Sequence, residues 1–291
     1  MNYYSRFLTD KPLKELSTFG IGGPSKYFIE ISTIEDMQGL IAFCGKEGLD
    51  YLLIGKGSNC LFDDRGFDGV VILNKIAFCK IDGLQVHVGA GYSFSLLGVQ
   101  TARKGLAGLE FASGIPATVG GAIYMNAGAN KQETQDHLLE VSFVNEKGDL
   151  EVLKKEDLHF SYRTSSFQNR KGAIVSALFQ LTENSDARKK QLTIIDYRTK
   201  TQPYGEKSAG CVFRNPSEGS AGALIEKSGL KGFSLGGAEV SEMHANFIIN
   251  KADAKTNDVL ELAYHVQKHV KEQSGIELEM EIRCIPYSRN K

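Results

Sequence analysis

One glycine-rich stretch constrains the fold of this 291-residue chain more than any other feature. Residues 105–129 read GLAGLEFASGIPATVGGAIYMNAGA and hold six glycines but a single charged side chain, Glu110. A stretch this apolar belongs in a core, yet glycine weakens helices and strands and favours positive φ or a close backbone approach. The pattern predicts a chain that wraps around a flat or phosphorylated ligand and presents backbone amides to it. A tight turn between buried elements is the alternative interpretation.

Composition excludes several classes of protein and of partner. The fractions of hydrophobic (42%) and charged (24%) residues are those of an ordinary globular protein, which argues against disordered and fibrous classes. The balance of 34 basic against 35 acidic residues predicts no nucleic-acid partner. No apolar run approaches the ~20 residues that span a bilayer, so we expect no membrane insertion. The N-terminus lacks the apolar segment of a signal peptide, and the five cysteines form no CxxC pair; we therefore expect a cytoplasmic protein without a metal site.

A second glycine-bearing loop, GKGSN at residues 55–59, follows an apolar strand predicted for residues 51–54. It is not a dinucleotide-binding fingerprint, because the third glycine of G-x-G-x-x-G is replaced by Cys60, and it lacks the ending of a P-loop. What remains is a polar turn at the end of a strand. Such a turn can direct its amides, with the Ser58 and Asn59 side chains, at a phosphate group.

Hydrophobic periodicity predicts alternating helices and strands along most of the chain. Thr33 is predicted to cap a helix that begins at Ile34 and is closed by Gly48. The other predicted helices lie at residues 93–104, 191–200 and 220–227, with a last one capped by Thr256 or Asn257 and ended by Gly275. Strands are predicted within residues 17–31 and at 70–73, 84–88, 139–144, 150–153, 173–181 and 244–249. Residues 276–283 alternate apolar and charged side chains, which predicts a strand buried on one side.

A set of short motifs, found in one order along nearly the whole chain, points to a known family. They are STFGIGG (17–23), GKGSN (55–59), GIP with TVGGA (114–122), Tyr162-Arg163, GCVFRNP (210–216), Gly236-Gly237 and LEMEIR (278–283). With this ordered set the chain resembles the FAD-dependent UDP-N-acetylenolpyruvoylglucosamine reductases, or UDP-N-acetylmuramate dehydrogenases, of bacterial peptidoglycan synthesis. Each motif alone is weak, but the set is specific.

The resemblance implies an α+β fold in which two domains of the vanillyl-alcohol-oxidase type hold FAD between them. A third, C-terminal α/β domain closes over the substrate. We expect the first domain at residues 1–76, with residues 280–291 returning to it, the second at 77–203 and the third at 204–279. The reading of GKGSN as a phosphate-binding turn agrees with this arrangement.

The resemblance also implies the ligands. FAD would be bound without a covalent link, NADPH would reduce it, and a UDP-linked enolpyruvyl amino sugar would then receive hydride from the reduced flavin. In such a reaction the cofactor carries the redox chemistry and the protein positions it. By motif position, the FAD contacts are Gly55, Lys56, Gly57, Ser58, Asn59, Gly114, Ile115, Pro116, Thr118, Val119, Gly120, Gly121 and Ala122.

Three residues are the candidates for catalysis by their place in the motifs. Arg163 and Glu281 would polarise the substrate carboxylate and stabilise the anionic intermediate, which requires a cation or an acid. Cys211 would supply the proton in place of the serine that many members carry, and a thiol is a stronger acid than a hydroxyl. Without the family resemblance, each residue has a structural alternative. Arg163 would form a surface salt bridge, Glu281 would lie on the solvated face of a strand, and Cys211 would be a small buried side chain. Tyr162, Asn215 and His244 are the predicted substrate contacts.

Two features refine the prediction. The spacing between Arg163 and Cys211 is shorter than in members that insert a tyrosine-bearing lid, so we expect the shorter subtype. His265 and His269 have the i, i+4 spacing of a metal-binding pair, but no third ligand is evident, which favours an exposed helix face.

Two other functions stay open: a flavin oxidase on the same scaffold, and a non-catalytic nucleotide-binding module.

Overall fold

The computed structural model describes residues 2–288, and contacts within the chain divide it into two units. Unit 1 comprises Met1–Leu8, Phe28–Lys56 and Val70–Arg198, and unit 2 comprises Thr9–Tyr27, Gly57–Gly69 and Thr199–Lys291. Because the chain passes repeatedly from one unit to the other, neither is a continuous segment. The predicted domain boundaries after residues 76 and 203 stay a prediction.

Unit 1 is built on a five-stranded antiparallel sheet. Its strands, in spatial order, are β12 (Leu150–Lys154), β11 (Leu138–Asn145), β15 (Gly172–Gln180), β7 (Gln85–Gly89) and β6 (Cys79–Asp82). The strands predicted for residues 139–144 and 150–153 are confirmed and form a hairpin, since Val144 pairs with Leu150 and Val141 with Leu153. Alternate side chains of these strands face a core that includes Val86, Val88, Phe143 and Phe179.

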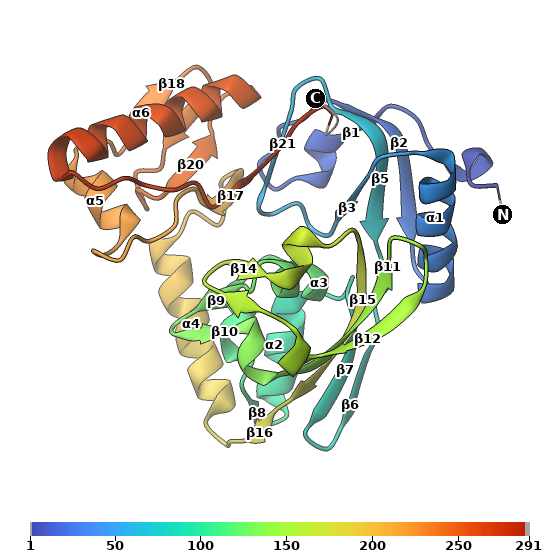
Figure 1. Cartoon of the computed structure of the whole chain (residues 1–291). Coiled ribbons are helices and arrows are strands. Elements are labelled where there is room, and N and C mark those ends of the chain that lie inside the picture. The colour runs from blue at the N-terminus through green and yellow to red at the C-terminus, as the bar shows by residue number, and fades with distance from the viewer. Residues whose placement is uncertain (1, 289–291) are drawn as a thin grey trace. The chain divides into compact units, whose positions relative to one another are not determined.

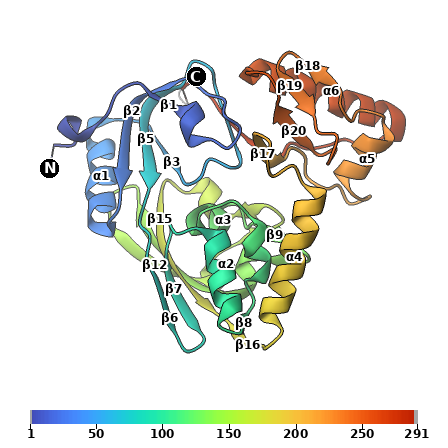
Figure 2. The ribbon, with the colours of Figure 1, turned by 180° about the vertical axis from the view of Figure 1, so that it is seen from behind.

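Two helices of unit 1 lie on one face of this sheet (Figure 1). They are α2 (Phe94–Arg103) and α3 (Val119–Tyr124), and Figure 2 brings both to the front of β7. Helix α3 contacts β7 and β15, so the glycine-rich stretch is packed onto the sheet. The start of α4 (Ala187–Thr201) joins the same unit, where Ala187 packs against Ala102 of α2.

The glycine-rich stretch forms a succession of short elements rather than one long one. They are β8 (Leu106–Ala107), a 3-10 helix (Glu110–Gly114), α3 and β9 (Gly128–Ala129). Gly105 and Gly108 have φ of +72° and +125°, values that side-chain-bearing residues rarely adopt. β8 pairs with β16 (Thr182–Glu183), and β9 pairs with β10 (Gln132–Glu133).

The first helix and its neighbouring strands match the local sequence signals. Helix α1 (Ile34–Glu47) begins where Thr33 Oγ1 accepts the Asp36 N–H at 3.2 Å, and it ends at Gly48 with φ +64°. Strand β3 (Tyr51–Ile54) is parallel to β5 (Phe67–Asn74), in a sheet of order β1-β2-β5-β3 completed by β1 (Lys11–Pro12) and β2 (Pro24–Ile31). The caps therefore set the helix ends as predicted.

An ion pair near the start of α1 gives unit 1 a pH-dependent stability. Arg6 donates from Nη1 and Nη2 to the two carboxylate oxygens of Asp36, each at 2.6 Å, and this lowers the pKa of Asp36. An unfolded Asp has a pKa of ~3.9, so the stabilisation is fully present above about pH 4 and is lost as pH falls through the lower folded pKa. We expect Asp36→Asn to lower the free energy of unfolding by up to ~1 kcal/mol at pH 7. In urea denaturation, the difference in unfolding free energy between the two proteins should shrink as pH falls below about 4, and a constant difference would contradict the assignment.

Unit 2 contains a four-stranded antiparallel sheet covered by two helices. Its order is β17 (Ser208–Cys211), β20 (Phe247–Asn250), β19 (Ala238–Val240) and β18 (Ser234–Leu235). Helix α6 (Thr256–Ser274) contacts β18, β19 and the shorter helix α5 (Ala221–Lys227), as Figure 1 shows. The apolar side of α6 enters the core of this unit through Val259, Leu262, Val266 and Val270.

Three local predictions in unit 2 are wrong in their bounds or caps. The strand predicted for residues 244–249 begins only at Phe247. Helix α6 has Lys255 at its N-cap position instead of Thr256 or Asn257. Its first N–H groups are accepted by other side chains: Asp64 Oδ2 accepts from Thr256 at 2.9 Å, and Asp258 Oδ2 from Lys255 at 2.9 Å.

The strand predicted for residues 276–283 is the third of these errors. Burial alternates as expected, with Leu278 and Ile282 buried and Glu277 exposed, but the regular strand β21 is only Arg283–Ile285. β21 is parallel to β4 (Cys60–Phe62), and the preceding residues make one isolated bridge, Phe213 to Met280. A two-residue period identifies extended backbone, but a strand also needs a neighbour with matching hydrogen bonds.

Candidate functional site

The GKGSN loop leaves consecutive backbone donors without acceptors. The N–H groups of residues 56–59 donate to no group among residues 2–288. Gly57 has φ +60°, and a Cβ there would lie 2.1 Å from the Leu16 carbonyl oxygen, so only glycine fits this turn. Successive unengaged N–H groups in a turn attract an anion such as a phosphate. The loop therefore suits the diphosphate of a nucleotide cofactor.

Within unit 1 the start of this loop meets the first turn of α3. A Cβ on Gly55 would lie 2.2 Å from Thr118 Oγ1. Lys56 Nζ lies 3.2 Å from Ser93 Oγ, and Ser93 forms a backbone bridge with Thr118. Desolvation lowers the pKa of the Lys56 ammonium. The N-caps of α2 and α3 thus lie together beside Gly55, and Lys56 places a cation among them.

The glycine-rich stretch uses its own amides differently from the expectation. Val119 N–H donates to Tyr92 O at 2.9 Å, Gly120 N–H to Ala90 O at 2.8 Å, and Gly121 N–H to Thr118 Oγ1 at 3.3 Å. These donors are engaged inside the protein, so a ligand at residues 114–122 meets the surface of the stretch rather than a row of open amides. Gly120 is needed for packing, since a Cβ there would lie 2.9 Å from Ala90 Cβ.

Arg163 lies in a strained turn of unit 1. Strands β13 (Phe160–Ser161) and β14 (Thr164–Ser165) pair across a two-residue turn formed by Tyr162 and Arg163. Arg163 has φ +57°, a left-handed conformation that costs a non-glycine residue ~1–2 kcal/mol. Its guanidinium carbon lies 4.9 Å from the centre of the Tyr162 ring. Strain of this kind is typical of functional positions, where the surrounding structure maintains it.

Within unit 2, three of the predicted site residues lie on adjoining segments. Glu281 N–H donates to the carbonyl of Val212, the residue after Cys211, at 2.7 Å. Asn59 Nδ2 donates to the Glu281 carbonyl at 3.4 Å. Cys211 is half-buried at the end of β17, opposite Phe247 of β20. Unit 2 thus brings together the end of the GKGSN loop, the candidate proton donor and one candidate charged residue, whereas Arg163 belongs to unit 1.

Asn246 is a buried polar residue that the sequence reasoning missed. It is 3% exposed, its Oδ1 accepts the Phe213 N–H at 2.9 Å, and its Nδ2 donates to the Phe213 carbonyl at 2.8 Å. Val212 N–H donates to the Asn246 carbonyl at 2.8 Å, so this residue fixes the backbone that follows Cys211. An asparagine inside the apolar run HANFII was the available signal.

Two predicted substrate contacts of unit 2 have structural partners of their own. Asn215 Oδ1 accepts the N–H of Ala221, the first residue of α5, at 3.0 Å. His244 Nδ1 accepts the Asn246 N–H at 3.2 Å, and its ring packs edge-on against Phe247. Both side chains remain partly accessible, so their role as substrate contacts stays a prediction.

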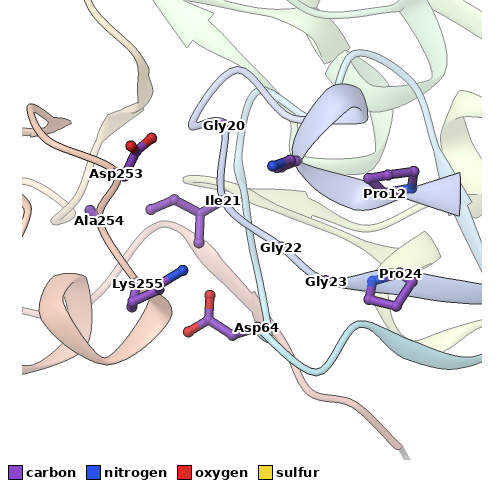
Figure 3. Close-up of a pocket in the computed structure, with 11 residues that line it drawn as sticks. Pro12, Gly20, Ile21, Gly22, Gly23, Pro24, Asp64, Asp253, Ala254 and Lys255 are labelled. Atoms are coloured by element: carbon purple, nitrogen blue, oxygen red, sulfur yellow. The ribbon is translucent and has the colours of Figure 1, made fainter. Parts of the chain in front are cut away.

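Unit 2 also contains a pocket of about 560 Å³ that is separate from Cys211 and Glu281. It is formed by the Gly20–Gly23 part of the STFGIGG motif and by the residues before α6, as Figure 3 shows. Asp64 and Lys255 point toward one another across it. Lys14 adds a second positive charge to the lining and Asp253 a second negative charge. This balance of charge favours neither an anionic nor a cationic ligand.

The histidine pair on α6 is not the exposed face that the sequence favoured. His265 and His269 are half-buried, with ring centres 4.3 Å apart, and Phe233 stacks on His265 at 4.4 Å. Burial, followed by the neighbouring His269, lowers the pKa of His265. Nowhere in residues 2–288 do three His, Cys, Asp or Glu side chains gather as metal ligands would. None of the helices described is both long enough and apolar enough to span a bilayer.

Comparison with known proteins agrees with this architecture. A family model described as an FAD-binding domain matches residues 25–154, and the C-terminal domain model of UDP-N-acetylenolpyruvoylglucosamine reductase matches residues 202–285. The UDP-N-acetylenolpyruvoylglucosamine reductase of Protochlamydia amoebophila is 60% identical over 100% of this chain and 97% of its own length. That of Chlamydia muridarum is 48% identical over 96% of this chain and 94% of its own length.

A solved structure supports the same assignment. The UDP-N-acetylenolpyruvylglucosamine reductase of Thermus caldophilus superposes with a TM-score of 0.83 at 36% identity, covering 96% of this chain and 100% of the other. The fold and the loop define an FAD-dependent oxidoreductase of α+β class, as the sequence predicted. The chain belongs to the UDP-N-acetylenolpyruvoylglucosamine reductase family. The predicted family, enzyme class and FAD cofactor are thereby confirmed.

Proposed function

We propose that this protein reduces the enolpyruvyl group of UDP-N-acetylenolpyruvoylglucosamine to form UDP-N-acetylmuramate, with electrons from NADPH, during peptidoglycan precursor synthesis. Family membership supports the reaction. The observation that carries the cofactor part is the row of unengaged N–H groups at residues 56–59. Four adjacent N–H donors suit the diphosphate of FAD. A side chain fits at neither Gly55 nor Gly57, so the turn keeps its shape only with glycine at these positions.

The residues that would hold FAD fall into two groups. The amides of residues 56–59 would bind the diphosphate, and Lys56 would add a positive charge beside it. The segment 114–122 would contact the flavin through its packed surface. When bound without a covalent link, FAD supplies the two-electron transfer from NADPH to the substrate double bond. The protein supplies binding, orientation and a proton.

Three side chains would act on the substrate. Arg163 would bind the substrate carboxylate through its planar fork of N–H donors, and Tyr162 packs against that guanidinium. Glu281 would stabilise the anionic intermediate by acting in its protonated form or by holding a donor toward it. The Cys211 thiol would give its proton to the carbon beside the newly reduced one, and the resulting thiolate would be reprotonated from water. Asn215 and His244 would contact the remainder of the UDP-linked sugar.

The place of action and the partners follow from the same chemistry. A working thiol at Cys211 requires a reducing compartment, and a UDP-linked precursor and NADPH are both cytoplasmic metabolites, so we propose a cytoplasmic location. The near balance of 34 basic and 35 acidic residues supports the absence of a nucleic-acid partner.

An anaerobic spectroscopic titration tests the function. The purified protein is expected to show the visible absorption of a flavin, to bleach with NADPH, and to recover its colour when the UDP-linked enolpyruvyl sugar is added. Bleaching without recovery would contradict the substrate assignment while leaving a flavoprotein. Rapid recovery in air but not with the sugar would favour a flavin oxidase. A colourless protein that takes up no FAD would favour the non-catalytic module.

A further inference from the structure

The hairpin that carries Arg163 is too small to hold its own conformation. Strands β13 and β14 contribute only the pairs Phe160–Ser165 and Ser161–Thr164, and a short isolated hairpin is not stable in water. Turns with a left-handed residue at the third position favour glycine or asparagine there, whereas this turn has Arg163 with φ +57°. Other parts of unit 1 must therefore fix the turn.

Side-chain hydrogen bonds attach this hairpin to the end of α3. Ser165 Oγ donates to the Tyr124 carbonyl at 2.7 Å. Gln168 Nε2 donates to the same carbonyl at 3.0 Å and to the carbonyl of Arg163 at 3.0 Å. An amide nitrogen has two hydrogens, so Gln168 joins the strained residue directly to the last residue of α3.

Asn126 attaches the other side of the hairpin. Its Nδ2 donates to the Ser161 carbonyl at 3.0 Å and to Glu133 Oε2 at 2.8 Å, while its Oδ1 accepts the Gln135 N–H at 3.2 Å. The residue is completely buried and has φ +42°. A buried asparagine with both polar atoms satisfied is a rigid connection, because breaking any one bond leaves an unpaired polar group.

We propose that Gln168, assisted by Asn126, is a positioning residue that fixes Arg163 relative to α3. Thr118 caps this helix beside Gly55, and Tyr124 at its last residue holds the Arg163 turn. A single short helix thus links the predicted cofactor seat of unit 1 to the predicted substrate-binding arginine. By holding the Arg163 carbonyl, Gln168 fixes the backbone of the turn. The backbone in turn sets the direction in which the guanidinium points. This inference rests on the proposed role of Arg163 in binding the substrate carboxylate.

The test separates the two half-reactions of the holoenzyme. For Gln168→Ala we expect reoxidation of the reduced flavin by the UDP-linked enolpyruvyl sugar to slow about 10- to 100-fold, the range expected when a reacting geometry is misplaced by about 1 Å. Reduction by NADPH and the FAD dissociation constant, measured by flavin fluorescence, should stay within about twofold of wild type.

Two more variants keep the test decisive. Gln168→Glu has the same shape but donates only when protonated, so its reoxidation rate should rise relative to wild type as pH falls. Gln168→Glu also replaces Gln168→Ala in the test if the alanine variant does not fold. Gln85→Ala is the matched control and should match wild type, since the exposed Gln85 side chain donates to the Gln180 side chain on a neighbouring strand of the same unit.

Three results would contradict the inference, and a fourth would contradict only the proposed function. Unchanged reoxidation in Gln168→Ala would show that Gln168 does not position Arg163. A parallel loss of both half-reactions and of FAD binding, with no recovery of Gln168→Glu as pH falls, would show the same. Normal reoxidation in Arg163→Ala would remove the premise. If wild type itself is bleached by NADPH but not reoxidised by the sugar, the proposed substrate is wrong.

Discussion

Replacing Cys211 with alanine is expected to abolish reoxidation of the flavin by substrate while leaving its reduction by NADPH intact. The two steps separate because only the second needs a proton delivered to carbon. Removing a general acid typically costs about 10²- to 10⁴-fold in the step it serves. The Cys211 backbone lies at the end of β17, where Val212 is hydrogen-bonded to both Asn246 and Glu281, so loss of one sulfur atom should leave the segment in place. Anaerobic stopped-flow absorbance measures both rates.

Serine at the same position is the matched control for this variant. A hydroxyl is a weaker acid than a thiol but occupies the same place, so Cys211→Ser should retain much of both rates. Normal turnover by Cys211→Ala would contradict the assignment of Cys211 as proton donor. Equal loss in the alanine and serine variants, with a lowered thermal midpoint, would indicate a packing role for the sulfur.

The second large effect is expected from a single methyl group on Gly55. The added Cβ would lie 2.2 Å from Thr118 Oγ1 and 2.9 Å from its Cγ2, so either the GKGSN loop or the start of α3 must move. Overpacking of this kind costs ~1–3 kcal/mol, and we expect Gly55→Ala to weaken FAD binding about 10-fold or more. Flavin fluorescence titration of the apoprotein measures the affinity.

Gly205→Ala is the control, because a Cβ at that exposed glycine meets no atom within 4 Å. It should bind FAD as wild type does. Circular dichroism and the thermal midpoint of each apoprotein distinguish a displaced loop from general unfolding. Wild-type affinity in Gly55→Ala would show that the contact between the loop and α3 is not part of the cofactor seat.

Local signals were sufficient for much of the fold. Thr33 and Gly48 lie at the ends of α1 as predicted, and the turn at Asn145–Asp149 joins β11 to β12. These features depend on residues only a few positions apart, so their physical causes are contained in the sequence of each segment. The same is true of Gly57, whose positive φ a residue with a side chain would resist.

The start of α6 and the hydrogen bonds around the candidate site depend on distant residues. Asp64 supplies the acceptor for Thr256 N–H from 192 positions away. Asn246, in the turn before β20, fixes the backbone after Cys211, and Gln168 joins Arg163 to the end of α3. No periodicity or capping rule contains these pairings, because each partner lacks a local signal for the other.

The sequence by itself determined the family, the FAD cofactor and the motifs that carry Arg163, Cys211 and Glu281, since the ordered set of motifs spans the chain. It also predicted a row of amides, but assigned it to both glycine segments. Only the tertiary structure decided that the amides of residues 56–59 are open while those of Val119, Gly120 and Gly121 are engaged inside unit 1. The reason is physical: a glycine permits a close approach of backbone, but which partner approaches is set by the packing of the whole unit.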